Sequence, residues 1–267
     1  MTDAIDWTRA ADPRRRIGHH VEHHLEIGST NDRARQALDE PHGDGLAILA
    51  ELQTAGRGRR GRTWQSPSGR NLMLSVGTRP RLAASVAGLL GAATALAVHA
   101  ACTEAADAAV AVKWPNDVVD LEGRKVAGML LETALAGERL AHVVIGLGIN
   151  VNWRRDEMPA DISSTASSLA DLAGRDIDRV ALLDRLLDAL DAELAALERG
   201  ESPLERYRAA SWLDGRRVRV ALGEREVEGV ADGIGPAGEL LLTTPEGRLA
   251  VTVGEVLRVR PASAVPA

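Results

Sequence analysis

Apolar residues fall into short runs and long runs, and this difference separates expected strands from expected helices. Runs typical of buried strands occupy residues 46–52, 71–76, 110–114, 118–120, 125–132 and 142–147. An alanine- and leucine-rich segment at 83–103 and a leucine-periodic segment at 179–197 predict long helices. A shorter helix is predicted from the cap-forming cluster at 29–32 to Leu38, because such side chains satisfy the first backbone amides of a helix.

The pattern changes near residues 212–215. Short strand-like runs with turn residues between them follow at 216–220, 226–231, 239–243 and 250–253. This spacing predicts a small all-β barrel. We therefore expect an α+β fold, with a mixed β-sheet flanked by helices in residues 1–212, a C-terminal β-barrel in residues 213–262 and a disordered tail in residues 263–267.

The first 26 residues are polar and rich in histidine. His19 and His23, like His20 and His24, are four residues apart, so on a helix each pair would share a face and could chelate a metal. A solvated helix face explains the same pattern without a metal, and we favour that interpretation.

Composition restricts the class of protein. The single cysteine, Cys102, excludes an internal disulfide, suits a reducing compartment and is expected to be a small buried side chain on a helix. We expect no apolar run as long as the roughly 18 residues of a membrane span. The net charge of −6 argues against nonspecific binding to nucleic acid or to a membrane surface. We expect a soluble protein of the cytoplasm.

Positive charge is concentrated in one segment, since no acidic residue occurs from Leu52 to Thr103. The segment instead contains Arg57, Arg59, Arg60, Arg62, Arg70, Arg79 and Arg81. Because the whole chain carries −6, this segment at +7 leaves −13 for the remainder. Such a local field predicts an anionic ligand, which could be a phosphate, a carboxylate or a nucleic acid.

A glycine-rich loop at 53–69 forms the centre of that segment. Residues 56–61 match the dinucleotide fingerprint G-x-G-x-x-G, and residues 56–63 nearly match the phosphate-loop pattern. Both motifs need a helix directly after the glycines, whereas a strand is predicted here. The fingerprint also needs an acidic residue about 20 positions later, and none occurs before Glu104. We therefore interpret the loop as backbone amides and arginine forks that close over an anion, and we expect it to be mobile without one.

Lysine is nearly absent, because only Lys113 and Lys125 among the 32 basic residues are lysines. An ammonium is a compact point charge on a flexible stem, whereas a guanidinium is a rigid planar fork. In a chain that uses arginine almost everywhere, lysines mark positions where the fork would not fit. Both lie in the stretch 112–128, which is the candidate centre of the chemistry.

Several short motifs occur in order along the chain. They are Gly28-Ser29-Thr30-Asn31, residues 53–62 with Trp64, Lys113-Trp114-Pro115-Asn116-Asp117, Arg124-Lys125-Val126-Ala127-Gly128, and residues 146–152. From about Glu26 to Arg260 the chain resembles the biotin protein ligase family. This resemblance implies a class II synthetase-like mixed sheet followed by an SH3-like barrel. Since 28 residues precede the Ser-Thr-Asn motif, we expect the monofunctional type without an N-terminal DNA-binding domain.

The resemblance implies an ATP-dependent ligase that works in two steps, through biotinyl-5′-AMP. Biotin and ATP are the implied substrates and Mg²⁺ the implied metal ion. The implied acceptor is a lysine on the biotin carboxyl carrier domain of an acyl-CoA carboxylase. The resemblance implies no DNA or membrane partner. It does imply a homodimer that forms when ligand binds.

Site residues follow from the same resemblance. Biotin would be bound by Ser29, Thr30, Asn31, Gln53, Arg57, Gly58, Arg59, Lys125 and Gly128. ATP and the adenylate would be bound by Arg57, Arg59, Arg60, Arg62, Trp64, Lys113, Asn116, Lys125 and Asn150. The catalytic residues would be Lys125, Arg57 and Asp117. Taken alone, the Ser-Thr-Asn motif is also explained as a helix cap.

Lys125 is expected where the biotin carboxylate meets the α-phosphate, because one ammonium can neutralise both anions in a narrow gap. Lys113 would assist at the phosphates, and the alternative is a surface lysine at the end of a strand. The turn at 121–123 should fold Asp117 back toward Lys125. Asp117 could then hold Mg²⁺ or orient the acceptor lysine, or could simply form the turn after Pro115, and the sequence leaves these roles open.

Other functions compete with this interpretation. A lipoate–protein ligase or octanoyltransferase of the same fold also sets one lysine against an acyl group. A nucleic-acid-binding module could use the arginine segment and the terminal barrel. That module would be expected to carry aromatic side chains for base stacking, whereas the chain has five tryptophans, one tyrosine and no phenylalanine.

Overall fold

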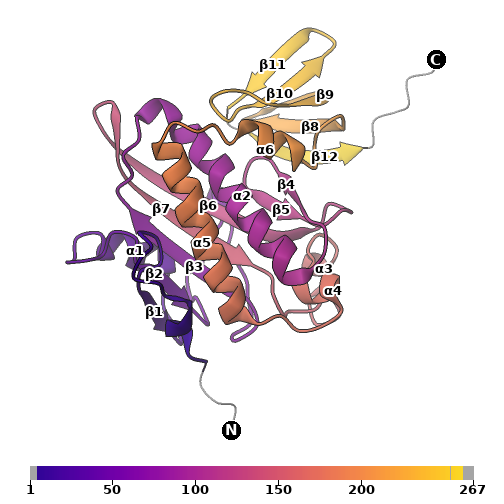
Figure 1. The fold of residues 1–267 in the computed structure, drawn as a ribbon. Helices are drawn as coiled ribbons and strands as arrows, with labels where there is room; N and C mark the ends of the chain where they lie inside the picture. The colour runs from indigo at the N-terminus through magenta and orange to yellow at the C-terminus, as the bar shows by residue number, and fades with distance from the viewer. Residues whose placement is uncertain (1–4, 253, 261–267) are drawn as a thin grey trace.

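The computed structural model describes residues 5–252 and 254–260, and its centre is a seven-stranded mixed sheet (Figure 1). The strand order is β1-β2-β3-β7-β6-β5-β4. Only β1 and β2 pair in parallel, and the other neighbours are antiparallel. The strands are β1 (Val21–His24), β2 (Ala47–Ala50), β3 (Leu72–Thr78), β4 (Ala111–Lys113), β5 (Asp117–Val119), β6 (Lys125–Ala136) and β7 (Arg139–Ile149). The predicted mixed sheet is confirmed.

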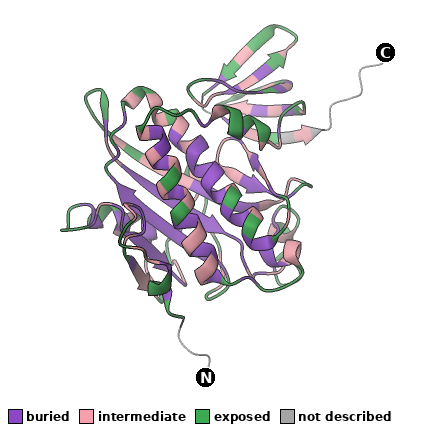
Figure 2. Ribbon diagram, in the orientation of Figure 1, coloured by how far each residue is buried: buried purple, intermediate pink, exposed green. Residues whose placement is uncertain are grey.

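Helices cover both faces of this sheet. The long helices α2 (Ala87–Ala106) and α5 (Arg179–Glu198) lie side by side on one face of the sheet (Figure 1), and Figure 2 shows that the central strands behind them are largely buried. Helix α1 (Thr30–Ala37) packs on the other face, because Ile48 contacts it while the alternate residue Leu49 belongs to the α2–α5 core. The shorter helices are α3 (Ala160–Ser163), α4 (Leu169–Ala173), α6 (Leu204–Ala209) and the 3₁₀ turns η1 (Trp7–Ala10), η2 (Arg59–Gly61) and η3 (Ala84–Val86).

Helix α2 corrects one expectation from the sequence. The helical segment Ala84–Ala106 has a mean hydropathy of 1.6 and is long and apolar enough to cross a membrane, so the expectation that no run reaches that length is wrong. In the fold it packs against α5 and the sheet, and Cys102 on it is fully buried. A helix that is apolar on all sides is typical of a protein core as well as of a membrane.

The C-terminal region forms a separate five-stranded antiparallel sheet with the order β11-β10-β9-β8-β12. Its strands are β8 (Arg217–Leu222), β9 (Arg225–Ile234), β10 (Leu240–Thr244), β11 (Gly247–Val251) and β12 (Glu255–Arg260). Strand β12 was not predicted. Within the described residues the sheet is open at β11 and β12, so a small β domain is confirmed and its closure into a barrel is not shown. The expected disordered tail lies outside the described residues.

His23 and His24 lie in strand β1, His19 and His20 lie in the irregular segment before it, and the predicted helix face is wrong. Pairing of β1 with β2 overrides the local pattern. His23 packs against the ring of Trp7, with centroids 5.7 Å apart, and its Nε2 lies 3.4 Å from Glu51. Within 5–252 and 254–260, no group of three or more histidine, cysteine or acidic residues could hold a metal ion.

Candidate active site

Consecutive hairpins bring the two lysines to one place. Strand β4 pairs with β5, and β5 pairs with β6, which begins at Lys125. The connecting turn is held by Asp120, whose carboxylate accepts hydrogen bonds from the backbone amides of Glu122 (3.1 Å) and Arg124 (2.9 Å). As a result, the Nζ of Lys125 lies 2.8 Å from Oδ1 of Asp117. The prediction that this turn brings Asp117 to Lys125 is confirmed.

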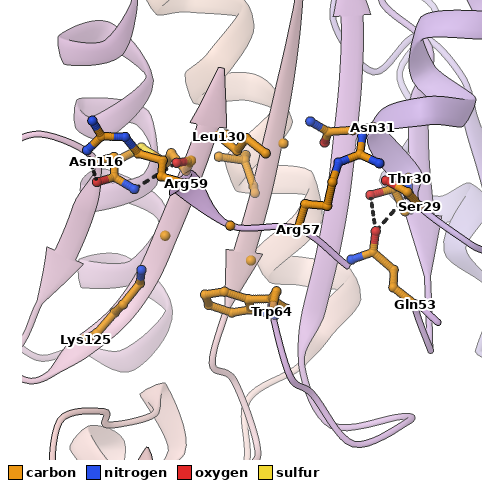
Figure 3. Close-up of a pocket in the computed structure, with 16 residues that line it drawn as sticks. Ser29, Thr30, Asn31, Gln53, Arg57, Arg59, Trp64, Asn116, Lys125 and Leu130 are labelled. Atoms are coloured by element: carbon orange, nitrogen blue, oxygen red, sulfur yellow. Dashed lines mark hydrogen bonds between the residues drawn. The ribbon is translucent and has the colours of Figure 1, made fainter. Parts of the chain in front are cut away.

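A first pocket of about 490 Å³, counting its open mouth, lies on the face of the sheet opposite α2 and α5. Figure 3 shows Ser29, Thr30 and Gln53 at one end, Lys125 and Asn116 at the other, and Trp64 between them. The predicted site residues that line it are Ser29, Thr30, Asn31, Gln53, Arg57, Gly58, Arg59, Trp64, Asn116, Lys125 and Gly128. Met129, Leu130, Gly146, Leu147 and Gly148 also line it and were not predicted as site residues.

The floor of this pocket is glycine. In the β6–β7 ladder Gly128 faces Gly148, and Leu130 faces Gly146. A Cβ at Gly148 would lie 2.4 Å from the Trp64 ring, and one at Gly146 would lie 2.1 Å from Oδ1 of Asn31. Side chains there would fill the space, so the pocket exists because these strands carry glycine on this face. The Gly-x-Gly repeat at 146–148 was the available signal in the sequence.

The neutral end of the pocket is a chain of hydrogen bonds. The Thr30 backbone amide (2.8 Å) and hydroxyl (3.0 Å) both donate to Oε1 of Gln53. The buried hydroxyl of Ser75 on β3 lies 2.7 Å from Oγ1 of Thr30 and 2.6 Å from Oδ1 of Asn31. Ser29 precedes α1, and its side chain makes no capping hydrogen bond. The helix-cap interpretation of the Ser-Thr-Asn motif therefore does not account for the Ser29 hydroxyl.

A second pocket of about 700 Å³ adjoins the first and is strongly charged. Both pockets share Gly58, Arg59, Trp64, Asn116 and Lys125. The second pocket adds Arg60, Arg62, Thr63, Lys113, Trp114, Pro115, Asp117, Glu255 and Val256. Glu255 and Val256 come from β12 of the C-terminal sheet, so the wall is built by both parts of the chain.

Trp64 divides the two pockets. Its ring lies over Gly128 and Gly148, and the Nζ of Lys125 lies 5.4 Å from the ring centroid. An ammonium over an aromatic face is attracted by the ring quadrupole. The resemblance assigned Trp64 to the nucleotide alone, whereas the structure places it at the boundary.

Each of the four loop arginines already has a partner in the protein. Arg57 forms a bidentate pair with Asp32 at 2.8 and 2.6 Å, and this contact lowers the pKa of the Asp32 carboxyl. Arg59 donates to Oδ1 of Asn116 at 3.0 Å.

Arg60 and Arg62 both pair with Glu255, Arg60 at 2.8 Å. Burial raises the pKa of the Glu255 carboxyl, but these two arginines outweigh it and the net shift is downward. Asp32 and Glu255 therefore neutralise part of the charge of the loop without a bound anion.

The remaining predicted residues differ in placement. Lys113 lines the second pocket, and burial lowers the pKa of its ammonium. Arg57 lines only the first pocket. Asn150 lines neither pocket: its amide donates to the backbone carbonyls of Lys125 (3.3 Å) and Ser167 (3.1 Å). Asn150 follows the end of β7, and its contact with the adenylate stays a prediction.

A protein-held metal does not fit this site. Oδ1 of Asp117 is paired with Lys125, and Lys113 lines the same pocket. Of the residues that the structure describes, Glu255 is the only other acidic residue that lines the second pocket, and it is paired with arginines. Hard divalent cations need more oxygen ligands than this arrangement leaves.

Comparisons with known proteins agree with this geometry. Residues 26–150 match the Biotin/lipoate A/B protein ligase family, and residues 215–259 match the Biotin protein ligase C terminal domain. The chain is 36% identical to a Mycobacterium tuberculosis biotin--[acetyl-CoA-carboxylase] ligase, over 88% of this chain and 87% of that protein. It is 32% identical to the Bacillus subtilis bifunctional ligase/repressor BirA, over 86% and 71%. A biotin protein ligase from Aquifex aeolicus, solved in complex with biotin and ATP, superposes with a TM-score of 0.76 at 30% identity, over 91% and 99% of the two chains.

Proposed function

The chain belongs to the biotin protein ligase family, and from this premise we infer that it is an ATP-dependent biotin–[acetyl-CoA-carboxylase] ligase. The single observation that carries the proposal is the joining of a neutral polar pocket to a cationic one, with Lys125 in the wall of both. An uncharged ring with an acyl chain fits the first pocket, and a polyphosphate fits the second.

Biotin lies in the first pocket in this proposal. Its ureido ring would meet the short polar side chains of Ser29, Thr30 and Gln53, since unpaired buried polar groups cost about 1–3 kcal/mol each. Its apolar chain would cross the glycine floor beside Trp64. The carboxylate would then reach Lys125 and Arg59 at the boundary of the two pockets.

ATP lies in the second pocket, with its phosphates among Arg59, Arg60, Arg62, Lys113 and Lys125. In the first step a carboxylate oxygen of biotin attacks the α-phosphorus, and the bond to pyrophosphate breaks. Lys125 offsets the repulsion between the two anions as they approach. In the second step the neutral amine of the acceptor lysine attacks the acyl carbon, AMP leaves, and an amide bond forms. The acceptor is the biotin carboxyl carrier domain of an acyl-CoA carboxylase.

Asp117 is proposed to orient Lys125 before the substrates arrive and to meet the acceptor lysine afterwards. Its 2.8 Å contact with Lys125 supports this role over that of a metal ligand. Mg²⁺ would enter on the phosphates of ATP and would supply further charge neutralisation there. We further propose that the protein is cytoplasmic, forms a homodimer when its ligand binds and has no DNA partner. We also propose that the C-terminal domain begins at residue 213.

Biotin is favoured over lipoate by the hydrogen-bonded end of the first pocket. A dithiolane ring has no N–H or C=O to pair with Thr30, Gln53 and the Ser29 hydroxyl. Sites built to bind polar groups discriminate strongly against ligands that lack those groups.

The proposal is tested by ATP–pyrophosphate exchange with biotin, with lipoate and with no acid, followed by transfer to a biotin carboxyl carrier domain. Exchange that depends on biotin, and label on the carrier domain, are expected. Exchange with lipoate alone would assign the chain to the rival function. Binding of an operator fragment at physiological salt without exchange would favour a nucleic-acid module.

A further inference from the structure

Trp212 occupies the junction between α6 and the C-terminal sheet and is held there from several sides. Its backbone amide donates to the Val112 carbonyl at 2.8 Å, and its indole Nε1 donates to the Leu121 carbonyl at 3.1 Å. A Cβ on Gly123 would lie 2.3 Å from the ring, so the indole packs directly on that turn. The residue thus ties the start of the C-terminal domain to the hairpins that carry both lysines.

The face of the same indole carries Lys113. The Nζ of Lys113 lies 5.4 Å from the ring centroid, and the Arg216 guanidinium carbon lies 4.4 Å from it. Among residues 5–252 and 254–260, Lys113 makes no ion pair within 4.0 Å and no side-chain hydrogen bond, yet it is half-buried and lines the second pocket.

Half-burying an ammonium costs free energy unless something compensates for the lost water. A carboxylate would compensate, but it would also compete with a phosphate for the same N–H groups. An aromatic face stabilises the charge without occupying those groups, so they stay available to a ligand. Lys125 differs, since its ammonium is already paired with Asp117 at 2.8 Å.

We propose that Trp212 is a positioning residue for ATP, whose indole holds the Lys113 ammonium charged and unpaired against the phosphates. The proposal rests on the proposed function, because it takes the second pocket as the triphosphate site. It assigns the domain junction a part in nucleotide affinity, and biotin affinity should not depend on it, since neither Trp212 nor Lys113 lines the first pocket.

A double-mutant cycle tests the proposal by biotin-dependent pyrophosphate exchange. Trp212→Leu should raise the KM for ATP by about three- to tenfold, the range of a half-buried cation–π contact, with the KM for biotin unchanged. Trp212→Phe keeps an aromatic face and loses the indole N–H, so it should retain a KM within about twofold of wild type. In a Lys113→Met background, Trp212→Leu should raise the KM for ATP by less than about twofold.

Arg216→Gln is the matched control, because it removes the other cation from the same ring and should leave both KM values unchanged. If Trp212→Leu does not fold, Trp212→Met takes its place in the cycle. A full effect of Trp212→Leu in the Lys113→Met background overturns the proposal and assigns Trp212 to the Gly123 turn. Equal increases in both KM values also overturn it. Wild-type protein without biotin-dependent exchange would instead overturn the proposed function.

Discussion

The two adjoining pockets are built on different principles. The first is neutral at one end, where Thr30 hydrogen-bonds to both Gln53 and Ser75, and the glycines of β6 and β7 leave room for a ring. The second is charged, and its cations contact groups from the C-terminal part of the chain, such as Glu255 and Trp212. A network of buried hydrogen bonds fixes a shape, whereas exposed ion pairs are worth little and exchange easily. The first pocket is therefore preformed. In the second pocket, the protein groups that pair with the cations can be replaced by the phosphates of a ligand.

The largest effect should come from Lys125, the residue at which the two kinds of site meet. Lys125→Arg should reduce biotin-dependent pyrophosphate exchange by at least about 10²–10³-fold, because a planar fork does not fit between Asp117 and Trp64 and cannot place one charge against both anions. Arg124→Lys, the reverse exchange at the neighbouring position, should leave exchange close to wild type. Near-normal exchange in Lys125→Arg would remove Lys125 from the mechanism.

The sequence motifs predicted most of the first pocket because its residues lie in short, locally determined units. The start of α1 fixes the Ser-Thr-Asn side chains, and the β4–β5–β6 hairpins fix residues 113–128. A motif gives proximity along the chain and not the direction of a side chain, so it could not show that the Asn150 amide donates to the carbonyl of Lys125. The sequence left the roles of Asp117 open, because it does not specify the 2.8 Å contact between Oδ1 of Asp117 and Nζ of Lys125.

The residues that sequence reasoning missed act across long separations. Glu255 lies far along the chain from Arg60, and Trp212 far from Lys113, so neither contact leaves a local pattern. The helix predicted for the histidine-rich segment was wrong for a different reason. A spacing of four residues is compatible with one face of a helix, but pairing with β2 makes residues 21–24 a strand, and His19 and His20 precede that strand.

The preformed nature of the first pocket predicts sensitivity to a single methyl group. Gly148→Ala places a Cβ 2.4 Å from the Trp64 ring, so the indole must shift into the pocket. Overpacking of this kind costs about 1–3 kcal/mol, which predicts a roughly ten- to hundredfold rise in the KM for biotin and a smaller change for ATP. Gly91→Ala, on α2 with open space around its Cβ, is the control and should change neither KM. An unchanged KM for biotin in Gly148→Ala would mean that the floor does not contact the ligand.

The charged pocket should tolerate a change of cation at Lys113 better than at Lys125. Lys113→Arg should raise the KM for ATP by about tenfold or less, since charge is kept and only geometry changes. An exposed lysine deprotonates at about pH 10.4. Burial lowers the pKa of Lys113, so its ammonium deprotonates at a lower pH than that of an exposed lysine. The KM for ATP of the wild type should therefore rise on the alkaline side, and Lys113→Arg should flatten that rise. Parallel pH profiles would show that Lys113 is not the titrating group.

The smallest effect should appear at the replaceable partner of the loop, Glu255. Its carboxylate pairs with Arg60 and Arg62, and with Glu255→Gln the loop loses the anion that holds it to β12. Exposed ion pairs contribute about 0.2–1 kcal/mol each, so trypsin should cut the ligand-free loop at 54–66 about two- to fivefold faster in this variant.

Biotin with ATP should suppress cleavage in both proteins, because phosphates then replace the carboxylate. Asp176→Asn, which breaks the exposed pair with Arg154 (2.8 Å), controls for a general loss of surface charge and should leave loop cleavage unchanged. Equal cleavage of wild type and Glu255→Gln would mean that the loop is held by Arg57 and Arg59 alone. The second pocket would then be as preformed as the first, and the contrast between the two pockets would not hold.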